Sequence, residues 1–159
     1  MSKANSFADD VDFALAAYRD QGQWEIVEID PEDVSDLDDF LAQLRRFPSE
    51  VGVIGMISIN EEFFVLARVF GEHDRVLLSD ASVMIEWSIA AEVADRFELV
   101  DPDEDGIVPA GDMAIIDDLG VSTIDLALLL DDDESYPDEV LLQIAHRLGF
   151  GPAFEAFLG

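Results

Sequence analysis

The sequence predicts an α+β protein, with an antiparallel sheet of about five strands, one helix packed on it, and a helical C-terminal half. Apolar residues repeat with the two-residue period of strands in two stretches before residue 81, and with a helical period after it. Half of the 159 residues are hydrophobic, which argues against a disordered chain. We expect a sheet region over residues 1–100 and a helical region over 101–159, packed together as one unit.

The first two strands are expected at 11–18 and 23–29, as a hairpin closed by the glycine-containing turn between them. Apolar side chains alternate along both segments, less cleanly in the second. In the first, one side carries Val11, Phe13, Leu15 and Ala17. The alanines in 14–17 leave a helix as the alternative for this segment.

A helix over 36–46 is expected next, with Ser35 as its N-cap and an end before Pro48. It has an apolar stripe and an acidic face, which is typical of a helix lying on a sheet. The stripe consists of Leu37, Phe40, Leu41 and Leu44.

The strongest strand signals are 51–59, 62–70 and 75–80, which short polar turns join into a meander. Both faces of these strands are apolar, so both must be covered. Within 62–70, Phe63, Val65 and Val69 lie on one side, and Phe64, Leu66 and Phe70 on the other. The 36–46 helix covers one face; the other needs the C-terminal half, a second copy of the chain, or a partner protein.

After residue 81 the pattern is helical. Helices are expected at 83–97, at about 112–119 ending at Gly120, at 123–130, and at 137–148. Pro137 suits a first helical turn and Gly149 a C-terminal cap. The remaining tail is expected to form one last turn.

Charge is the most unusual property of the chain. It has 37 Asp and Glu against 8 Lys and Arg, a formal net charge of −29. Phosphate backbones and anionic membranes repel such a protein, so direct binding of nucleic acid or membrane is not expected. Basic protein surfaces and divalent cations are the partners it attracts. Solubility alone, or a saline cytoplasm, also explains the acidity.

The chemistry-bearing residues are few. There is no cysteine, which excludes disulfides and thiolate sites. His73, in a predicted turn, and His146, on a predicted helix surface, belong to no zinc motif, and no phosphate-binding glycine loop is present. We expect no cofactor and no catalytic residue. Without a signal-like or membrane-spanning segment, the expected location is the cytoplasm.

Two acidic segments are candidate sites. Residues 101–112 begin like an EF-hand calcium loop, because alternate carboxylates before a glycine place oxygens around a hard cation. The candidate ligands are Asp101, Asp103, Asp105 and Asp112. Pro102 and Pro109 fit that loop poorly, and position twelve lacks the motif's glutamate, so a solvated acidic loop is the alternative.

The second segment is a candidate docking patch for a basic protein surface. It comprises Asp131, Asp132, Asp133 and Glu134. Tyr136, Pro137, Phe150 and Gly151 are the accompanying surface candidates. Helix capping and packing of the tail are the alternative explanation for these four residues.

Several stretches resemble the actinobacterial family of tRNA adenosine deaminase-associated proteins. They are 62–69 with 76–82, then 109–120, then 136–155 with its Tyr-Pro-Asp-Glu and Arg-Leu-Gly-Phe-Gly sequences. The resemblance runs from about Phe13 over nearly the whole chain. It implies neither catalytic residues nor a metal set, and it makes the deaminase a candidate partner.

Three functional hypotheses remain. The first is a non-catalytic accessory protein that binds a basic protein partner, with the tRNA adenosine deaminase as the candidate. The second is a cation- or small-ligand-binding module that uses residues 101–112, and the third is an enzyme with an unfamiliar carboxylate site. A homodimer is compatible with all three, since a second copy could cover the open sheet face.

Overall fold

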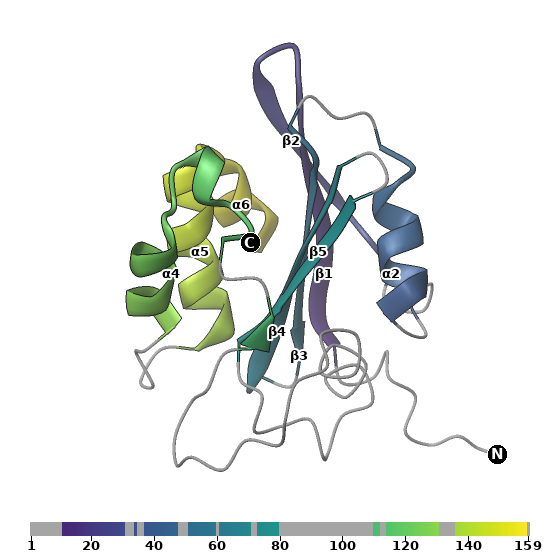
Figure 1. Ribbon diagram of the computed structural model, residues 1–159. Helices are drawn as coiled ribbons and strands as arrows, with labels where there is room; N and C mark the ends of the chain where they lie inside the picture. The colour runs from purple at the N-terminus through teal and green to yellow at the C-terminus, as the bar shows by residue number, and fades with distance from the viewer. Residues whose placement is uncertain are drawn as a thin grey trace, which may run out of the picture.

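A computed structural model describes most of the chain as a sheet lying between two helical layers (Figure 1). Helix α2 covers one face of the sheet, and α4, α5 and α6 lie on the other. The described residues are 11–30, 34, 37–47, 51–59, 61–70, 73–79, 110–111, 114–130 and 136–158. This arrangement confirms the predicted α+β class.

The sheet is antiparallel, with strand order β2-β1-β3-β4-β5-β6. Its hairpin and meander are those predicted, and the first segment is a strand rather than a helix. A two-residue sixth strand extends the sheet at the β5 edge. The strands are β1 (Val11–Asp20), β2 (Gln23–Glu28), β3 (Val53–Ile59), β4 (Phe63–Phe70), β5 (His73–Leu78) and β6 (Ala110–Gly111).

The alternation predicted for the first strand fails at Val11. Val11 packs on the α2 side of the sheet, whereas Phe13 packs on the opposite side. The pairing of β1 with β3 shifts register between these two residues, so the side-chain direction reverses there. At the shift, the Asp12 carboxylate accepts hydrogen bonds from the Ser58 hydroxyl at 3.0 Å and the Glu61 amide at 2.7 Å.

Helix α2 (Leu37–Leu44) buries the predicted stripe against β3 and β4. It approaches the sheet closely at Gly55, where a Cβ atom would lie 2.6 Å from side-chain atoms of both Phe40 and Leu44. The absence of a side chain at Gly55 therefore sets the spacing between helix and sheet. The proposed N-cap Ser35 lies outside the described residues, as does the helix predicted at 83–97.

The C-terminal half covers the second face of the sheet. Helices α4 (Thr123–Leu130), α5 (Pro137–Leu148) and α6 (Gly151–Leu158) share one buried cluster with the strands. Of the three covers considered for this face, the chain's own helices are the one found. Members of the cluster include Leu15, Ile54, Met56, Phe64, Leu66, Leu77, Leu126, Leu141, Ile144 and Phe154.

The predicted helix at 112–119 is not found over its described residues, 114–119. These residues form a turn followed by a 3-10 helix, η3 (Asp117–Leu119), which ends at Gly120 in the left-handed conformation. The Ile115 carbonyl accepts a hydrogen bond from the Arg68 side chain, and the Leu119 amide bonds to Ile116 instead. A long-range side chain thus occupies a carbonyl that an α-helix would use.

The two glycines after α5 have different roles. Gly149 ends α5 with φ of 115°, a conformation that disfavours other residues. Gly151 begins α6, where a Cβ atom would lie 2.1 Å from the His146 ring.

The tail forms the eight-residue helix α6, which is longer than the single last turn that was expected. It packs on the hairpin, with the Phe154 ring 5.8 Å from that of Phe13.

Candidate functional site

The structure places only some of the predicted site residues. The acidic patch at 131–134 and the candidate calcium ligands Asp101, Asp103, Asp105 and Asp112 lie outside the described residues. Within the part of the chain that the structure describes, no three His, Cys, Asp or Glu side chains are grouped as metal ligands. The same part contains no helix that is both long enough and apolar enough to span a bilayer.

Tyr136 and Phe150, the two aromatic docking candidates, have opposite environments. The Tyr136 side chain is 58% exposed and stays available for contact. Phe150 is 2% exposed and packs against Trp24, with ring centroids 5.0 Å apart. Phe150 therefore stabilises the contact between the C-terminal half and the hairpin, as the packing alternative expected.

The Tyr-Pro-Asp-Glu sequence forms the start of α5. Pro137 occupies the first turn, and the Glu139 carboxylate accepts a hydrogen bond from the Tyr136 amide at 2.9 Å. This bond pairs an amide that would otherwise lack a helical acceptor. The Tyr-Pro-Asp-Glu sequence thus has a local structural role, and the Tyr136 ring remains exposed beside it.

Arg68 is a buried cation that sequence reasoning did not single out. It lies on β4, faces the C-terminal half, and is 3% exposed. All five of its N–H groups donate hydrogen bonds. The Val51 carbonyl accepts from Nε at 3.0 Å and from Nη2 at 2.5 Å, and the Ile115 carbonyl accepts from Nη1 at 3.0 Å. The Asp118 carboxylate accepts from Nη1 at 2.5 Å and from Nη2 at 3.0 Å. Arg68 therefore joins the sheet to the loop before α4.

The Arg68 hydrogen bond lowers the pKa of Asp118 below the ordinary value of 3.8. Burial opposes this effect by raising the pKa of Asp118, and the positive charges of Arg68 and Arg75 add to the lowering. Asp118 is consequently ionised at neutral pH and keeps the arginine charge neutralised.

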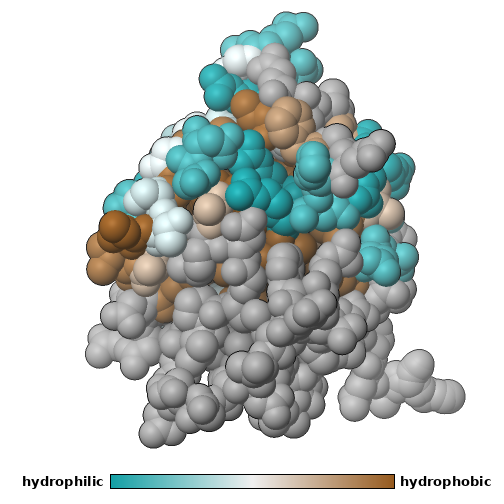
Figure 2. Space-filling view, in the orientation of Figure 1, coloured by the Kyte–Doolittle hydropathy of each residue, from teal (hydrophilic) through white to brown (hydrophobic). Residues whose placement is uncertain are grey.

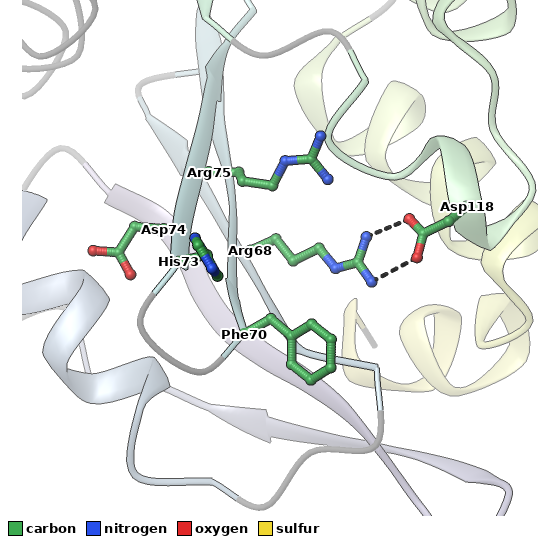
Figure 3. A pocket seen from close by; sticks show the side chains of 6 residues that line it. All are labelled: Arg68, Phe70, His73, Asp74, Arg75 and Asp118. Atoms are coloured by element: carbon green, nitrogen blue, oxygen red, sulfur yellow. Dashed lines mark hydrogen bonds and ion pairs between the residues drawn. The ribbon is translucent and has the colours of Figure 1, made fainter.

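A pocket of about 390 Å³ lies around this pair (Figure 3). Its lining residues are Arg68, Phe70, His73, Asp74, Arg75 and Asp118. In Figure 3 the arginines and Phe70 point toward the C-terminal half, whereas Asp74 points to the opposite side of β5, where it pairs with Arg45. The six lining side chains include no hydroxyl or thiol nucleophile.

The chemistry of this pocket is ion pairing. The volume suits a small ligand. Arg68, however, has no donor left for one, because carbonyls and Asp118 occupy all five. Arg68 is therefore best explained as a structural connection between the two halves of the core.

A second surface feature is the outer face of α4. Ile124 is 73% exposed and Leu128 is 67% exposed, and the two lie one helical turn apart. Figure 2 shows this hydrophobic patch on the outer side of the helical layer, over α4. We call the two residues the α4 ridge. Large aliphatic side chains at this exposure are a recognised mark of contact surfaces when they are grouped.

Both missed features left a signal in the sequence. Arg68 is the one charged residue inside the apolar strand 63–70, which is unusual for a strand buried on both faces. The segment 123–130 carries apolar residues on every side of a helix, so some of them must face outward or contact another protein. The partners of Arg68 were not predictable, since two of them are backbone carbonyls.

The fold and these surfaces define an acidic α+β protein whose buried charge serves packing and whose notable exposed feature is an apolar ridge. Its sheet is covered on both faces by its own helices. The described residues thus present a pocket around the Arg68–Asp118 pair and an exposed apolar ridge on α4.

The chain belongs to the family described as Rv3753c-like tRNA adenosine deaminase-associated protein, whose model matches residues 12–151. Protein Rv3753c of Mycobacterium tuberculosis strain H37Rv is 33% identical over 150 residues, which cover 92% of this chain and 87% of that protein. No solved structure matches the chain. The family resemblance predicted from residues 62–69, 76–82, 109–120 and 136–155 is thereby confirmed.

Proposed function

We propose that this chain is a non-catalytic accessory protein that binds the tRNA adenosine deaminase by surface contact in the cytoplasm. The observation that carries the proposal is the net charge of −29 in a member of a family described as associated with that enzyme. A protein that holds tRNA must present basic side chains to the phosphate backbone. An acidic protein is attracted to the same surface.

Charge also suggests what such contact does. Oppositely charged surfaces accelerate encounter and fix orientation, and both effects weaken as salt screens them. An acidic chain seated on a tRNA-binding surface competes with tRNA for it. We therefore propose that the bound chain limits access of tRNA to the enzyme, with the run Asp131–Glu134 among its contacts.

Co-expression of the chain with the tRNA adenosine deaminase, followed by size-exclusion chromatography, tests this function. At about 50 mM salt we expect a shared peak, which shrinks at about 300 mM salt because ionic contacts are screened. An unrelated basic protein of similar size, run under the same conditions, controls for non-specific attraction. Separate elution of chain and deaminase at both salt concentrations would exclude the proposed function.

A competition measurement addresses the mechanism. Fluorescently labelled tRNA bound to the deaminase should be displaced when the chain is added, and the displacement should require less of the chain as salt is lowered. If a ternary complex of tRNA, enzyme and chain forms instead, the chain binds away from the tRNA surface.

A further inference from the structure

The outer face of α4 differs from the exposed first turns of α2 and α5. The exposed residues in these first turns include four carboxylates: Asp38, Asp39, Asp138 and Glu139. On α4 the corresponding positions carry Ile124 and Leu128. A surface helix normally confines its apolar residues to the core-facing stripe, so α4 is apolar on both its inner and outer sides.

The ridge is held on a firmly packed helix. Leu126 and Leu130 of α4 are buried against the C-terminal core, with 0% and 4% exposure. The Ser122 hydroxyl accepts a hydrogen bond from the Asp125 amide at 3.1 Å, which caps the first turn. Asp125 also pairs with Arg147 of α5 at 3.4 Å. The outward position of Ile124 and Leu128 is therefore a consequence of defined packing.

The elements on either side of α4 in the sequence are acidic. The elements that flank α4 in the chain, η3 and α5, present exposed carboxylates, and Arg147 beside the ridge is paired with Asp125. These carboxylates are Asp117, Asp138 and Glu139, together with Asp118, which is paired with Arg68. An apolar strip on a chain with a net charge of −29 fits a partner whose apolar side chains are bordered by Lys and Arg.

We propose that the α4 ridge is the docking surface for a basic amphipathic helix of the partner protein. This inference rests on the proposed function, which names the deaminase as that partner. Helices dock in this way by laying an apolar stripe on an apolar surface, while charges at the border set orientation. A second copy of this chain is a poor occupant, because each copy carries a net charge of −29.

The test is binding of the deaminase by the double variant Ile124→Ser, Leu128→Ser. Both side chains are mostly exposed, so the variant keeps the fold, which circular dichroism and urea unfolding verify. We expect about 100-fold weaker binding than for the native chain, as for loss of central apolar contacts. The matched control is Leu158→Ser, which removes an exposed leucine of α6 (40% exposed) and should bind like the native chain.

The salt dependence of binding distinguishes apolar contact at the ridge from general charge attraction. Apolar contacts are not screened, so the native chain should retain some binding at about 500 mM salt, whereas the double variant should retain none. If the native chain and the double variant bind equally well at about 50 mM salt and at about 500 mM salt, the docking inference is wrong and the proposed function still stands. Failure of the native chain itself to bind would overturn both.

Sedimentation of the purified chain tests whether a second copy of the chain occupies the ridge. We expect a monomer for the native chain and for the double variant. If the native chain forms a dimer that the double variant does not, the ridge joins two copies, and the inference of a basic partner helix is wrong.

Discussion

Arg68 connects parts of the chain that are far apart in sequence. It sits on β4, and its hydrogen bonds reach Val51, two residues before β3, and the segment that precedes α4. A buried guanidinium is tolerated only where its donors are matched, and here all five are. Its position on the apolar second face of the sheet is thus explained by partners that the C-terminal half supplies.

We predict that Arg68→Met lowers the free energy of unfolding by about 2–4 kcal/mol, measured by urea unfolding at neutral pH. The substitution preserves much of the apolar stem but leaves the Val51 and Ile115 carbonyls without their donor. The milder control is Asp118→Asn, which should cost about 1 kcal/mol or less, because Asp118 is half-exposed and solvent screens its charge. Equal costs for both variants would contradict a structural role centred on Arg68.

Acid should reduce the difference between the native chain and Asp118→Asn. The pKa of Asp118 is lowered in the folded state, mainly by the Arg68 hydrogen bond, so its contribution is fully present above the unfolded value near 3.8. That contribution is lost as pH falls through the lowered folded pKa. Unfolding of both proteins over a pH series, compared pairwise, isolates this group from the other carboxylates.

At the scale of elements, α6 closes the C-terminal half against the hairpin. Phe154 and Phe157 both contact the Phe13 ring edge-on, at 5.8 and 5.9 Å. Phe154 is fully buried, whereas Phe157 is only partly buried. The helix therefore contributes one core side chain and one peripheral side chain to the same aromatic group.

This difference predicts unequal costs for the same substitution. Phe154→Ala should lower the free energy of unfolding by about 3–5 kcal/mol, since it leaves a cavity in the core. Phe157→Ala keeps the contact with Phe13 through Phe154 and should cost about 1–2 kcal/mol. Thermal or urea unfolding of the two variants measures both values, and a larger loss for Phe157→Ala would show that α6 is packed differently.

The elements themselves were largely predictable. Strands β1 to β5 and helices α2, α4 and α5 follow from apolar periodicity, which reports the face that each element buries. Prediction failed where a contact distant in sequence intervened. The shift at Asp12 reverses Val11, and the Arg68 hydrogen bond to Ile115 accompanies a 3-10 turn where a helix was expected.

The candidate site was less predictable than the fold. Exposed Tyr136 and buried Phe150 lie in one distinctive stretch of sequence, and nothing local distinguishes them. The ridge residues Ile124 and Leu128 look like core residues until the orientation of α4 is known. Contact surfaces depend on which side of an element remains uncovered, and this is a property of packing.

For the whole molecule, charge acts on stability as well as on binding. A net charge of −29 repels itself in the compact state. Raising sodium chloride from about 10 to about 150 mM shortens the screening length from about 30 to about 8 Å. We predict that the melting temperature rises by several degrees over this range, as calorimetry would measure.

Calcium at equal ionic strength provides the control. An equal rise in melting temperature indicates screening alone, whereas a clearly larger rise indicates bound divalent cations, which the acidic loop 101–112 was proposed to hold. A melting temperature that is constant or falls with sodium chloride would mean that self-repulsion does not limit stability.

The sequence by itself determined the α+β class, the strand meander, the acidity and the need to cover both faces of the sheet, because periodicity and composition are local properties. Only the tertiary structure decided that the chain's own C-terminal helices cover the second face, that Arg68 joins them to the sheet, and that α4 turns two aliphatic side chains outward. These outcomes depend on which distant segments meet. The free energy of such a contact depends on both segments together, so the local pattern of either one does not reveal it.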